Sequence, residues 1–311
     1  MRGHERMHIL ILGAGALGSL VGSRLSRTRA RVSLLSTNRL HMEAIRRGGL
    51  VVEELDDSLT RYEIPAFTDP GEIRENADLV LVTVKTYATE AAVRSILSVR
   101  GASTLFLTLQ NGVGNHERIS RIVGESSVIV GVTAQGATLV EPGRVRHGGN
   151  GLTVIGEFSG EPSSRVRTVV DRFLEAGINT EAGGNMQQLI WQKLMVNVGI
   201  NAITALTGIR NGQINTIPDA RSLSRAAVEE ALVVAERKGF RFEEDMVQRV
   251  YAVAEATSRN RSSMGQDIDR GRPTEIDAIN GAIVSYGREL GVPVTVNETL
   301  SRLVRTLQSR H

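Results

Sequence analysis

A lysine and two asparagines stand four residues apart within one apolar stretch of the chain, residues 188–207. These polar residues are Lys193, Asn197 and Asn201. A spacing of four places side chains on one face of a helix, one turn above the next. Their neighbours are almost all large and apolar, which is typical of a buried helix. An unpaired buried polar group costs free energy, so these side chains need partners. Either the protein supplies the partners and the lysine reaches toward solvent, or the face binds a polar ligand.

The composition of the chain narrows the class of protein. A length of 311 residues suggests about two domains. The absence of cysteine excludes disulfides, thiolate metal sites and a cysteine nucleophile. The six histidines are scattered without metal-ligand spacing, so no metal is expected. The net charge of +3 and the lack of a dense basic run argue against binding to nucleic acid.

No targeting segment is expected from the residues near the N-terminus. Its first six residues are polar and are expected to be an extension before the first strand. The apolar run that follows is too short for a signal peptide, and no segment is expected to span a membrane. A cytoplasmic location is therefore expected.

The N-terminal region contains a glycine-rich loop between a strand and a helix. The apolar run His8–Leu12 predicts a strand buried on both faces, and a helix is expected after the loop. The strand–turn–helix context indicates dinucleotide binding, with the pyrophosphate at the helix N-terminus. The expected cofactor-binding residues of the loop are Gly13, Ala14, Gly15, Ala16, Leu17 and Gly18.

The end of the second expected strand bears on the choice of cofactor. This strand covers Arg31–Leu35 and is followed by Ser36, Thr37, Asn38 and Arg39. An acidic residue that would bind the ribose hydroxyl of NAD is missing there. Hydroxyls, an amide and Arg39 suit a 2′-phosphate better, so NADP is favoured and NAD stays open. The alternative is that Arg39 merely begins the next helix in solvent.

Four strand ends are expected to meet at one edge of a parallel sheet. Besides Gly13 and Thr37, these ends carry Lys85 and Asn111. Ligands of open α/β sheets bind outside the carboxyl ends of the strands, which supports a site there. Further strands are expected at residues 128–138, 143–147 and 152–155. His147 is expected on a strand surface or in a hairpin rather than in catalysis.

A boundary at Gly183 and Gly184 divides the chain into residues 1–184 and 185–311. The second part is almost entirely helical in pattern, with helices expected at residues 188–207, 221–238, 243–257, 264–269, 274–290 and 294–308. Ser262 and Ser263 precede a short helix and are expected to cap it or bind an anion. Thr274 and Asp277 match the spacing of a capping box, which would place Glu275 in the first helical turn. These features suggest a two-domain oxidoreductase.

The motifs together resemble the ketopantoate reductase family (2-dehydropantoate 2-reductases). The resemblance extends from about Met7 to beyond Gly291. It is carried by Gly13–Gly18, Val84–Lys85, Gln110–Gly114, Trp191–Asn197 with Asn201, Ser262–Met264 with Gln266–Asp267, and Thr274–Asp277 with Asn280–Gly281. It implies an α/β fold in which a Rossmann dinucleotide-binding domain is followed by an all-helical domain similar to the C-terminal part of 6-phosphogluconate dehydrogenase.

The resemblance also implies a reaction and roles for residues. The reaction is NADPH-dependent reduction of 2-dehydropantoate to (R)-pantoate, on the route to pantothenate and coenzyme A. The resemblance makes Lys193 the proton donor and Glu275 the carboxylate that orients it, with Glu275 also near the cofactor. Asn197, Asn201 and Asn111 match substrate-binding asparagines, and Ser263 matches the serine that meets the substrate carboxylate. Lys85 and Asn111 match residues on the cofactor side.

The sequence departs from the family pattern at one position, because Thr37 stands where many members have an arginine for the 2′-phosphate. Two other functions stay open at this stage. One is a related reductase of another 2-keto acid, and the other is a nucleotide-binding regulatory protein without turnover. A homodimer is expected only by analogy with other helical second domains of this kind.

Overall fold

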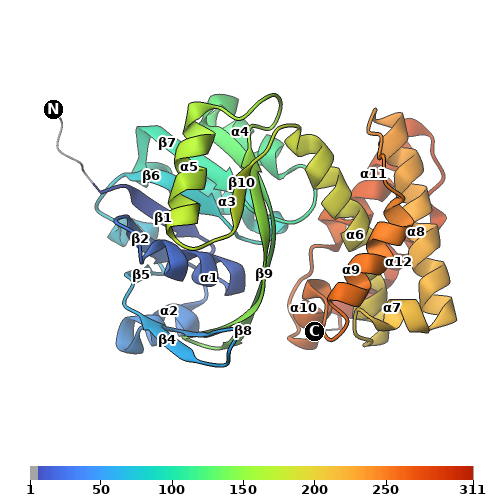
Figure 1. Cartoon of the computed structure of the whole chain (residues 1–311), viewed down its shortest axis with the longest axis horizontal. Coiled ribbons are helices and arrows are strands. Elements are labelled where there is room, and N and C mark those ends of the chain that lie inside the picture. Colours follow the sequence, from blue (N-terminus) through green and yellow to red (C-terminus); the bar gives the residue numbers. More distant parts are fainter. Residues whose placement is uncertain (1–5, 311) are drawn as a thin grey trace. The chain divides into compact units, whose positions relative to one another are not determined.

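The computed structural model describes residues 6–310, and the chain divides into two compact units (Figure 1). Most of the expected N-terminal extension lies outside the described residues. The first unit comprises Met1–Gln110 and Asn115–Met186, and the second comprises Asn111–Gly114 and Gln187–His311. The division therefore falls two residues after the expected boundary. It also assigns a short segment from the first half of the sequence to the second unit.

A ten-stranded mixed sheet forms the centre of the first unit. The strand order is β4-β3-β9-β8-β7-β6-β1-β2-β5, and β10 pairs with β9. The strands are β1 His8–Leu12, β2 Arg31–Leu35, β3 Leu50–Glu53, β4 Leu59–Tyr62, β5 Ala66–Phe67, β6 Ala77–Val82, β7 Arg100–Thr108, β8 Val128–Glu141, β9 Arg144–Gly156 and β10 Thr180–Ala182. The strands β3 and β4 form an antiparallel hairpin, and β4 lies at the edge of the sheet.

The strand β1 lies between β2 and β6 and pairs with both in parallel. The chain builds outward on one side of β1 through β2 and on the other through β6 and β7. The order thus reverses next to β1, and such a reversal is where open α/β sheets bind ligands. All five residues of β1 are buried, as its apolar run predicts.

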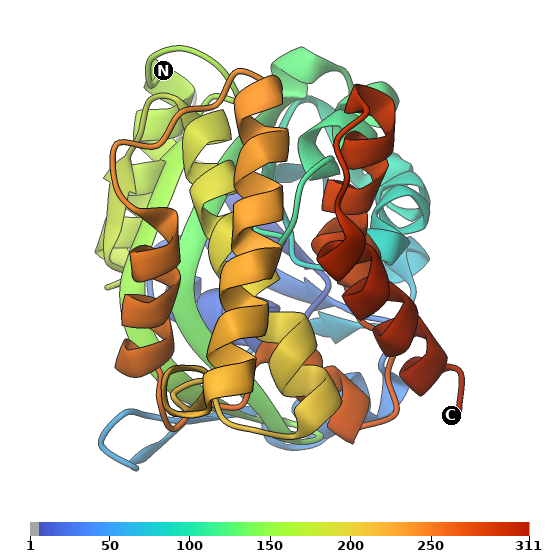
Figure 2. The ribbon, with the colours of Figure 1, turned by 90° about the vertical axis from the view of Figure 1, so that its right-hand side faces the viewer.

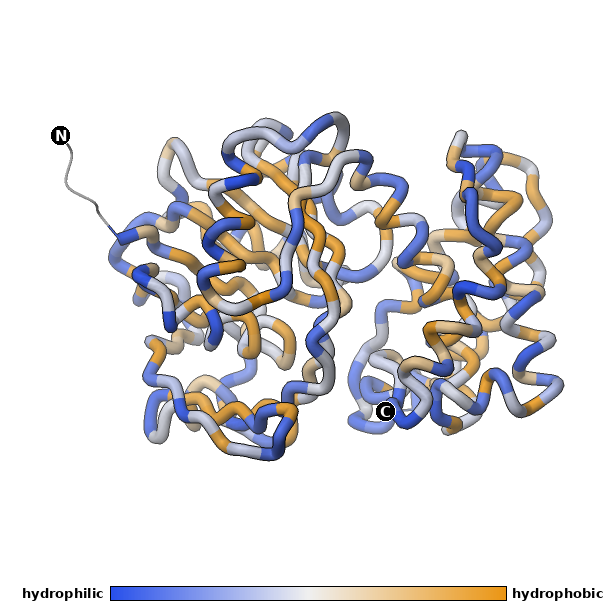
Figure 3. The backbone as a smooth tube through the Cα atoms, viewed as in Figure 1, coloured by the Kyte–Doolittle hydropathy of each residue, from blue (hydrophilic) through white to orange (hydrophobic). Residues whose placement is uncertain are grey.

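Helices cover both faces of the sheet in the first unit. They are α1 Ala16–Leu25, α2 Arg39–Gly48, α3 Thr89–Ser95, α4 Asn115–Val123 and α5 Ser164–Glu175. Successive side chains of a strand point to opposite faces, so β1 supplies two cores. Ile9 and Ile11 pack with α1 and α5, whereas Leu10 and Leu12 pack with α3 and α4. The apolar interior strands stand out in Figure 3.

The two longest strands, β8 and β9, form one antiparallel pair. The expectation of separate strands at 143–147 and 152–155 is wrong, because β9 runs without interruption from Arg144 to Gly156. The glycine-rich stretch between them stays in the sheet through irregularities in register, which lie between Thr133 and Gln135, between Gly136 and Ala137, and near the turn. Bulges let a strand absorb extra residues without ending.

The second unit contains only helices among its regular elements in the described part of the chain (Figure 2). They are α6 Met186–Thr207, which begins one residue before the unit, α7 Gln213–Thr216, α8 Pro218–Arg237, α9 Met246–Ala256, α10 Ser263–Asp269, α11 Asn280–Leu290 and α12 Thr295–Gln308. The long α8 packs against α7, α9, α11 and α12. Trp191, Leu194, Met195 and Val198 of α6 belong to the apolar core of this unit.

By length and composition α6 could cross a membrane, contrary to the expectation that no segment would qualify. Its best window has a mean hydropathy of 1.2, yet 61% of that window is buried inside the structure. The core helix of a globular unit gives the same signal, because it is apolar nearly all round. We therefore interpret α6 as a core helix.

The expected helix at 274–290 is wrong in its first turn. A 3₁₀ turn covers Ile276–Ala278, Ile279 leaves helical geometry, and α11 begins at Asn280. The expected capping box is also wrong. The Thr274 hydroxyl donates to Oε1 of Gln308 at 2.8 Å and accepts from the Ile276 N–H at 3.3 Å. Glu275 therefore precedes a 3₁₀ turn instead of lying within the first turn of a long helix.

Candidate active site

The glycine loop connects β1 to α1 and is fixed by its neighbours. Gly13 has a φ of 103°, and a Cβ there would collide with the backbone nitrogen of Val84. A Cβ on Gly18 would lie 2.6 Å from both the Gly13 carbonyl oxygen and the Thr83 hydroxyl oxygen. Both positions therefore need glycine for packing, as expected from the motif.

Gly15 differs from the other two glycines because it faces open space. The nearest heavy atom to a Cβ on Gly15 would be the Gly13 carbonyl oxygen, at 3.9 Å. Gly15 is also the N-cap of α1, and no side chain caps this helix. The first N–H groups of a helix have no partner within the helix, and they attract anions. The N–H groups of Gly13, Ala14 and Gly15 are bonded to backbone carbonyls, so the donors that fit the pyrophosphate of a dinucleotide are those in the first turn of α1.

Two polar side chains for which the sequence predicted no role, Thr83 and Gln110, hold the neighbouring loops. The Thr83 hydroxyl donates to the Gly13 carbonyl at 2.9 Å, which ties the loop after β6 to the glycine loop. The Gln110 amide donates to the Val84 carbonyl at 2.8 Å and to the Thr89 hydroxyl at 2.7 Å, which ties the end of β7 to the same region. Both residues follow the end of a strand, and this position is the feature of the sequence that could have identified them.

The expected residues at the carboxyl ends of β1, β2 and β6 lie in the first unit. Gly13 follows β1, Thr37 follows β2 and Lys85 follows β6, and these three strands are neighbours in the sheet. Thr37 and Arg39 are exposed, and neither side chain has a hydrogen bond or ion pair within the described chain. Asn38 caps α2 by accepting from the His41 N–H at 3.2 Å. Thr37 and Arg39 are therefore accessible to a ligand.

The polar face of α6 carries Lys193, Asn197 and Asn201, as the spacing predicts. Asn201 is only 5% exposed. The side-chain nitrogens of Asn197 and Asn201 are buried, and neither has a hydrogen-bond partner among the described residues. Buried donors normally have a partner, so two such donors on one helix face indicate a place for a polar ligand.

The Lys193 ammonium lies in a poorly solvated environment near a carboxylate. Desolvation lowers its pKa from the ordinary 10.5 to about 8, and the charge of Glu275 opposes this shift. Glu275 is itself buried, at 7% exposure. An acid whose pKa lies near the working pH is suited to proton transfer. Lys193 can therefore hold a proton at neutral pH and also release it.

The segment Asn111–Gly114 brings a further amide to Glu275 within the second unit. The Asn111 side-chain nitrogen lies 3.5 Å from Oε2 of Glu275. Gly112 has a φ of 81°, and a Cβ there would collide with the Ala278 carbonyl oxygen. This tight contact and the bond from the Val113 N–H to the Ala278 carbonyl at 3.4 Å hold Asn111 in place.

The two serines before α10 differ in their surroundings. Ser262 is buried and caps the helix, because its hydroxyl oxygen accepts from the Gly265 N–H at 3.1 Å. Ser263 is exposed, and its side chain has no hydrogen bond within the described chain. The expectation that one serine caps is confirmed for Ser262. Ser263 keeps a hydroxyl for a ligand.

His147 lies in β9 of the β8–β9 hairpin, one of the two expected positions, but it is buried and not on a strand surface. It is 8% exposed, and its Nδ1 lies 3.3 Å from a guanidinium nitrogen of Arg24. Burial and the Arg24 charge lower the pKa of His147. Arg24 also pairs with Glu54. This cluster joins α1 to β9 and to the β3–β4 hairpin.

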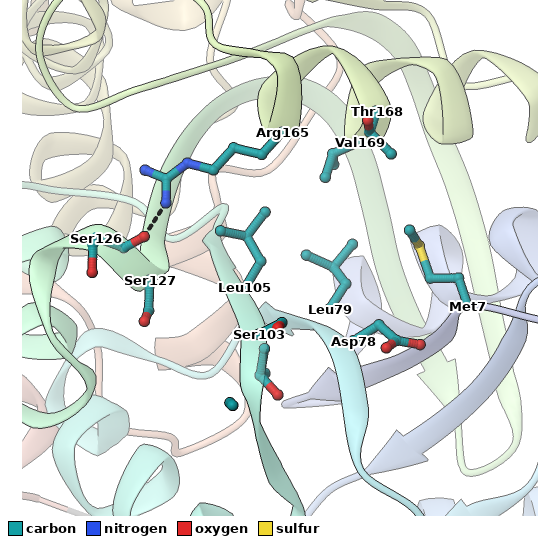
Figure 4. A pocket seen from close by; sticks show the side chains of 12 residues that line it. Met7, Asp78, Leu79, Ser103, Leu105, Ser126, Ser127, Arg165, Thr168 and Val169 are labelled. Atoms are coloured by element: carbon teal, nitrogen blue, oxygen red, sulfur yellow. Dashed lines mark hydrogen bonds between the residues drawn. The ribbon is translucent and has the colours of Figure 1, made fainter. Parts of the chain in front are cut away.

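A cavity of about 390 Å³ lies away from the strand carboxyl ends, beside the first halves of β6 and β7 (Figure 4). Arg165 extends along its wall, but the guanidinium is bonded to the Ser126 carbonyl and paired with Glu157. Because its one cation is already neutralised, this cavity does not resemble a site for an anionic ligand.

Comparison with known proteins decides the family. The family described as "Ketopantoate reductase PanE/ApbA" matches residues 9–160, and "Ketopantoate reductase PanE/ApbA C terminal" matches residues 185–308. The chain is 40% identical over 303 residues to a 2-dehydropantoate 2-reductase of Halobacterium salinarum, covering 97% of this chain and 99% of that protein. The chain belongs to the ketopantoate reductase family.

Solved structures agree with this membership. A PanE/ApbA family ketopantoate reductase from Ralstonia eutropha has 33% identity and a TM-score of 0.90, covering 98% of this chain and 99% of the other. A D-mandelate dehydrogenase solved with NADH and anilino(oxo)acetate has 26% identity and a TM-score of 0.91, with the same coverage. The Rossmann-type fold with a helical C-terminal domain is thus confirmed, and the chain is an NAD(P)-dependent oxidoreductase.

Proposed function

We propose that this chain reduces 2-dehydropantoate to (R)-pantoate with NADPH, in the biosynthesis of pantothenate and coenzyme A. The observation that carries the proposal is the polar face of α6. It combines a lysine of lowered pKa beside a carboxylate with two buried amide donors that lack partners. An anionic keto acid needs such donors, and its reduction needs a proton.

The first unit would bind the cofactor through backbone atoms. The free N–H groups at the start of α1 would hold the pyrophosphate at the loop Gly13–Gly18, including Ala14, Ala16 and Leu17. Bound NADPH supplies the hydride that reaches the keto carbon. The exposed Arg39, helped by the Thr37 hydroxyl, would bind the 2′-phosphate, and Lys85 would lie near the cofactor.

The second unit would bind and protonate the substrate. Asn197, Asn201 and Asn111 would donate to substrate oxygens, and the Ser263 hydroxyl would meet the carboxylate. The Lys193 ammonium would give its proton to the ketone oxygen and stabilise the negative charge that develops there. Glu275 would keep Lys193 protonated and oriented, and would also approach the cofactor.

The proposal extends to the setting of the reaction. The substrate is a small molecule, and neither nucleic acid nor a membrane takes part. The location would be the cytoplasm, and a homodimer is the assembly proposed by analogy. Light scattering on the purified protein measures the assembly directly.

A second candidate is reduction of a different 2-keto acid. It is favoured by the structural similarity to a D-mandelate dehydrogenase. Binding of a nucleotide without turnover is a third candidate. A protein that only binds a nucleotide would not need the lowered pKa of Lys193 or the unpaired amide nitrogens of Asn197 and Asn201.

One steady-state assay separates these candidates. Purified protein is mixed with NADPH or NADH and with ketopantoate, pyruvate or phenylglyoxylate, and cofactor absorbance is followed. The proposal predicts the highest kcat/KM for ketopantoate with NADPH. A higher value for an aryl keto acid would favour the second candidate. Cofactor binding without turnover on any of these acids would favour the third.

A further inference from the structure

The end of α6 is fastened to the residues just before Ser263. Thr204 lies on the turn of α6 that follows Asn201 and is fully buried. Its hydroxyl oxygen lies 2.7 Å from the Ser262 hydroxyl oxygen, 2.9 Å from the Ile200 carbonyl and 3.2 Å from the Asn201 carbonyl. A side chain in the interior of one helix thus reaches the cap of another.

Arg261 makes a second connection between the same two places. Its guanidinium donates to the carbonyls of Thr204 and Ile209, which lie at and beyond the C-terminal turn of α6. It also pairs with Asp269 at the end of α10, at 2.9 Å. A Cβ on Gly265 would collide with this guanidinium, so glycine makes the room that Arg261 needs.

The residue next to these contacts, Ser263, has no side-chain hydrogen bond among the described residues. Arg261 and Ser262 bond to α6, whereas the next side chain, Ser263, is exposed without a hydrogen bond inside the described chain. The fastening therefore fixes the backbone of Ser263 at a set distance from the turn that carries Asn201. Asn201 has a buried nitrogen without a partner.

We propose that Thr204, Ser262 and Arg261 are positioning residues for the keto acid. Together they form a latch, which holds the Ser263 hydroxyl and the Asn201 amide at a fixed separation. Both groups can then bind one substrate molecule. This inference rests on the proposed function, because it takes Ser263 and Asn201 as substrate donors. It adds three residues that would not touch the substrate.

The central test is Thr204→Val, with Thr204→Ser as the matched control. Valine keeps the branched shape and loses the hydroxyl, whereas serine keeps the hydroxyl and loses a methyl group. The latch predicts that Thr204→Val raises the KM for ketopantoate at least about tenfold and changes kcat less, since misplaced binding groups weaken substrate binding. The KM for NADPH and the Kd for NADPH stay at wild-type values. Thr204→Ser restores the KM for ketopantoate.

A purely structural role would give a different result. Thr204→Val would then lower the melting temperature, and the KM for ketopantoate and that for NADPH would both stay unchanged in the folded fraction. That outcome overturns the proposal. Arg261→Lys provides a second variant if Thr204→Val does not fold, because lysine keeps the charge but cannot bond to two carbonyls and Asp269 together. The latch predicts the same selective rise in KM.

A double-mutant cycle tests whether the latch acts through Ser263. If it does, Thr204→Val has little further effect on the KM for ketopantoate in a Ser263→Ala background. Additive effects would contradict the proposal. The wild-type assay keeps the two hypotheses apart. No turnover of ketopantoate by wild type refutes the proposed function, whereas normal turnover with an unchanged KM in Thr204→Val refutes only the latch.

Discussion

Two regions of the molecule could bind ligands, and they differ in the groups that they offer. One is the glycine loop of the first unit, and the other is the polar face of α6. The loop offers the backbone N–H groups at the start of α1, and glycine is required at Gly13 and Gly18 because a Cβ at either position would collide with its neighbours. The α6 face offers the side chains of Lys193, Asn197 and Asn201 on a helix whose other faces are packed in a core. One site depends on backbone shape, and the other depends on a few functional groups.

This difference predicts different responses to mutation. In the glycine loop, a substitution at a packed position should disturb the fold and the cofactor together. On α6, removal of a functional group should remove function with little loss of stability, because the buried amide nitrogens have no partner within the described chain to lose. Four predictions test the comparison, from the largest effect to the smallest.

Lys193→Ala should have the largest effect. We expect kcat/KM for ketopantoate to fall by about 10²- to 10⁴-fold, because the proton donor is lost. The Kd for NADPH should stay near the wild-type value, since the glycine loop is untouched. Stopped-flow turnover and fluorescence titration with NADPH measure the two quantities. Near-normal turnover would refute the assignment of Lys193 as proton donor.

Gly13→Ala and Gly15→Ala form a matched pair in the loop. Gly13→Ala should destabilise the first unit by about 1–3 kcal/mol and weaken NADPH binding, because its φ of 103° is strained for alanine and its Cβ has no room. Gly15→Ala should weaken NADPH binding without loss of stability, because its Cβ would point into open space. Denaturant unfolding and titration check both variants. Equal destabilisation by the two would count against the cradle at Gly15.

Asn201→Ala tests whether the polar face of α6 serves substrate binding more than stability. The KM for ketopantoate should rise by about 10- to 100-fold, the cost of one hydrogen bond to a charged or polar substrate. Stability should barely change. Asn280→Ala is the control, because Asn280 donates to the Val198 carbonyl at 3.3 Å and to Asn297 at 3.0 Å. It should cost about 1–3 kcal/mol of stability instead. If Asn201→Ala is the more destabilising variant, Asn201 belongs to a core network.

Arg39→Ala should have the smallest effect. The preference for NADPH over NADH should fall by about tenfold, because one charge-assisted contact to the 2′-phosphate is lost. The kcat at saturating NADPH should not change. Arg47→Ala is a suitable control, since Arg47 is exposed near the end of the same helix, α2. An unchanged preference in Arg39→Ala would show that Arg39 only begins α2 in solvent.

Local patterns predicted much of the fold and of the site. The fully buried β1, the glycine loop and the apolar α6 follow from short-range features, namely periodicity, glycine spacing and helical stacking. The placement of Gly13, Thr37 and Lys85 after neighbouring strands followed from the general behaviour of parallel sheets. These features need no knowledge of distant contacts.

Long-range contacts explain what the sequence did not reveal. The helix expected at 274–290 begins only at Asn280, and Thr274 bonds to Gln308, which lies 34 residues later. Asn111 joins the second unit through Gly112 and Ala278, and Thr204 meets Ser262 across 58 residues. The continuity of β9 depends on bulges against β8. No local periodicity encodes these pairings.

The pH dependence of the reaction in both directions tests the role of Lys193 most directly. Reduction of ketopantoate needs the protonated ammonium, so kcat/KM should fall as the pH rises through about 8, the lowered pKa of Lys193. Oxidation of pantoate by NADP⁺ needs the neutral amine, so its kcat/KM should rise through the same pH. A profile that is flat between pH 7 and 10, or that changes in the same direction for both reactions, would contradict the account.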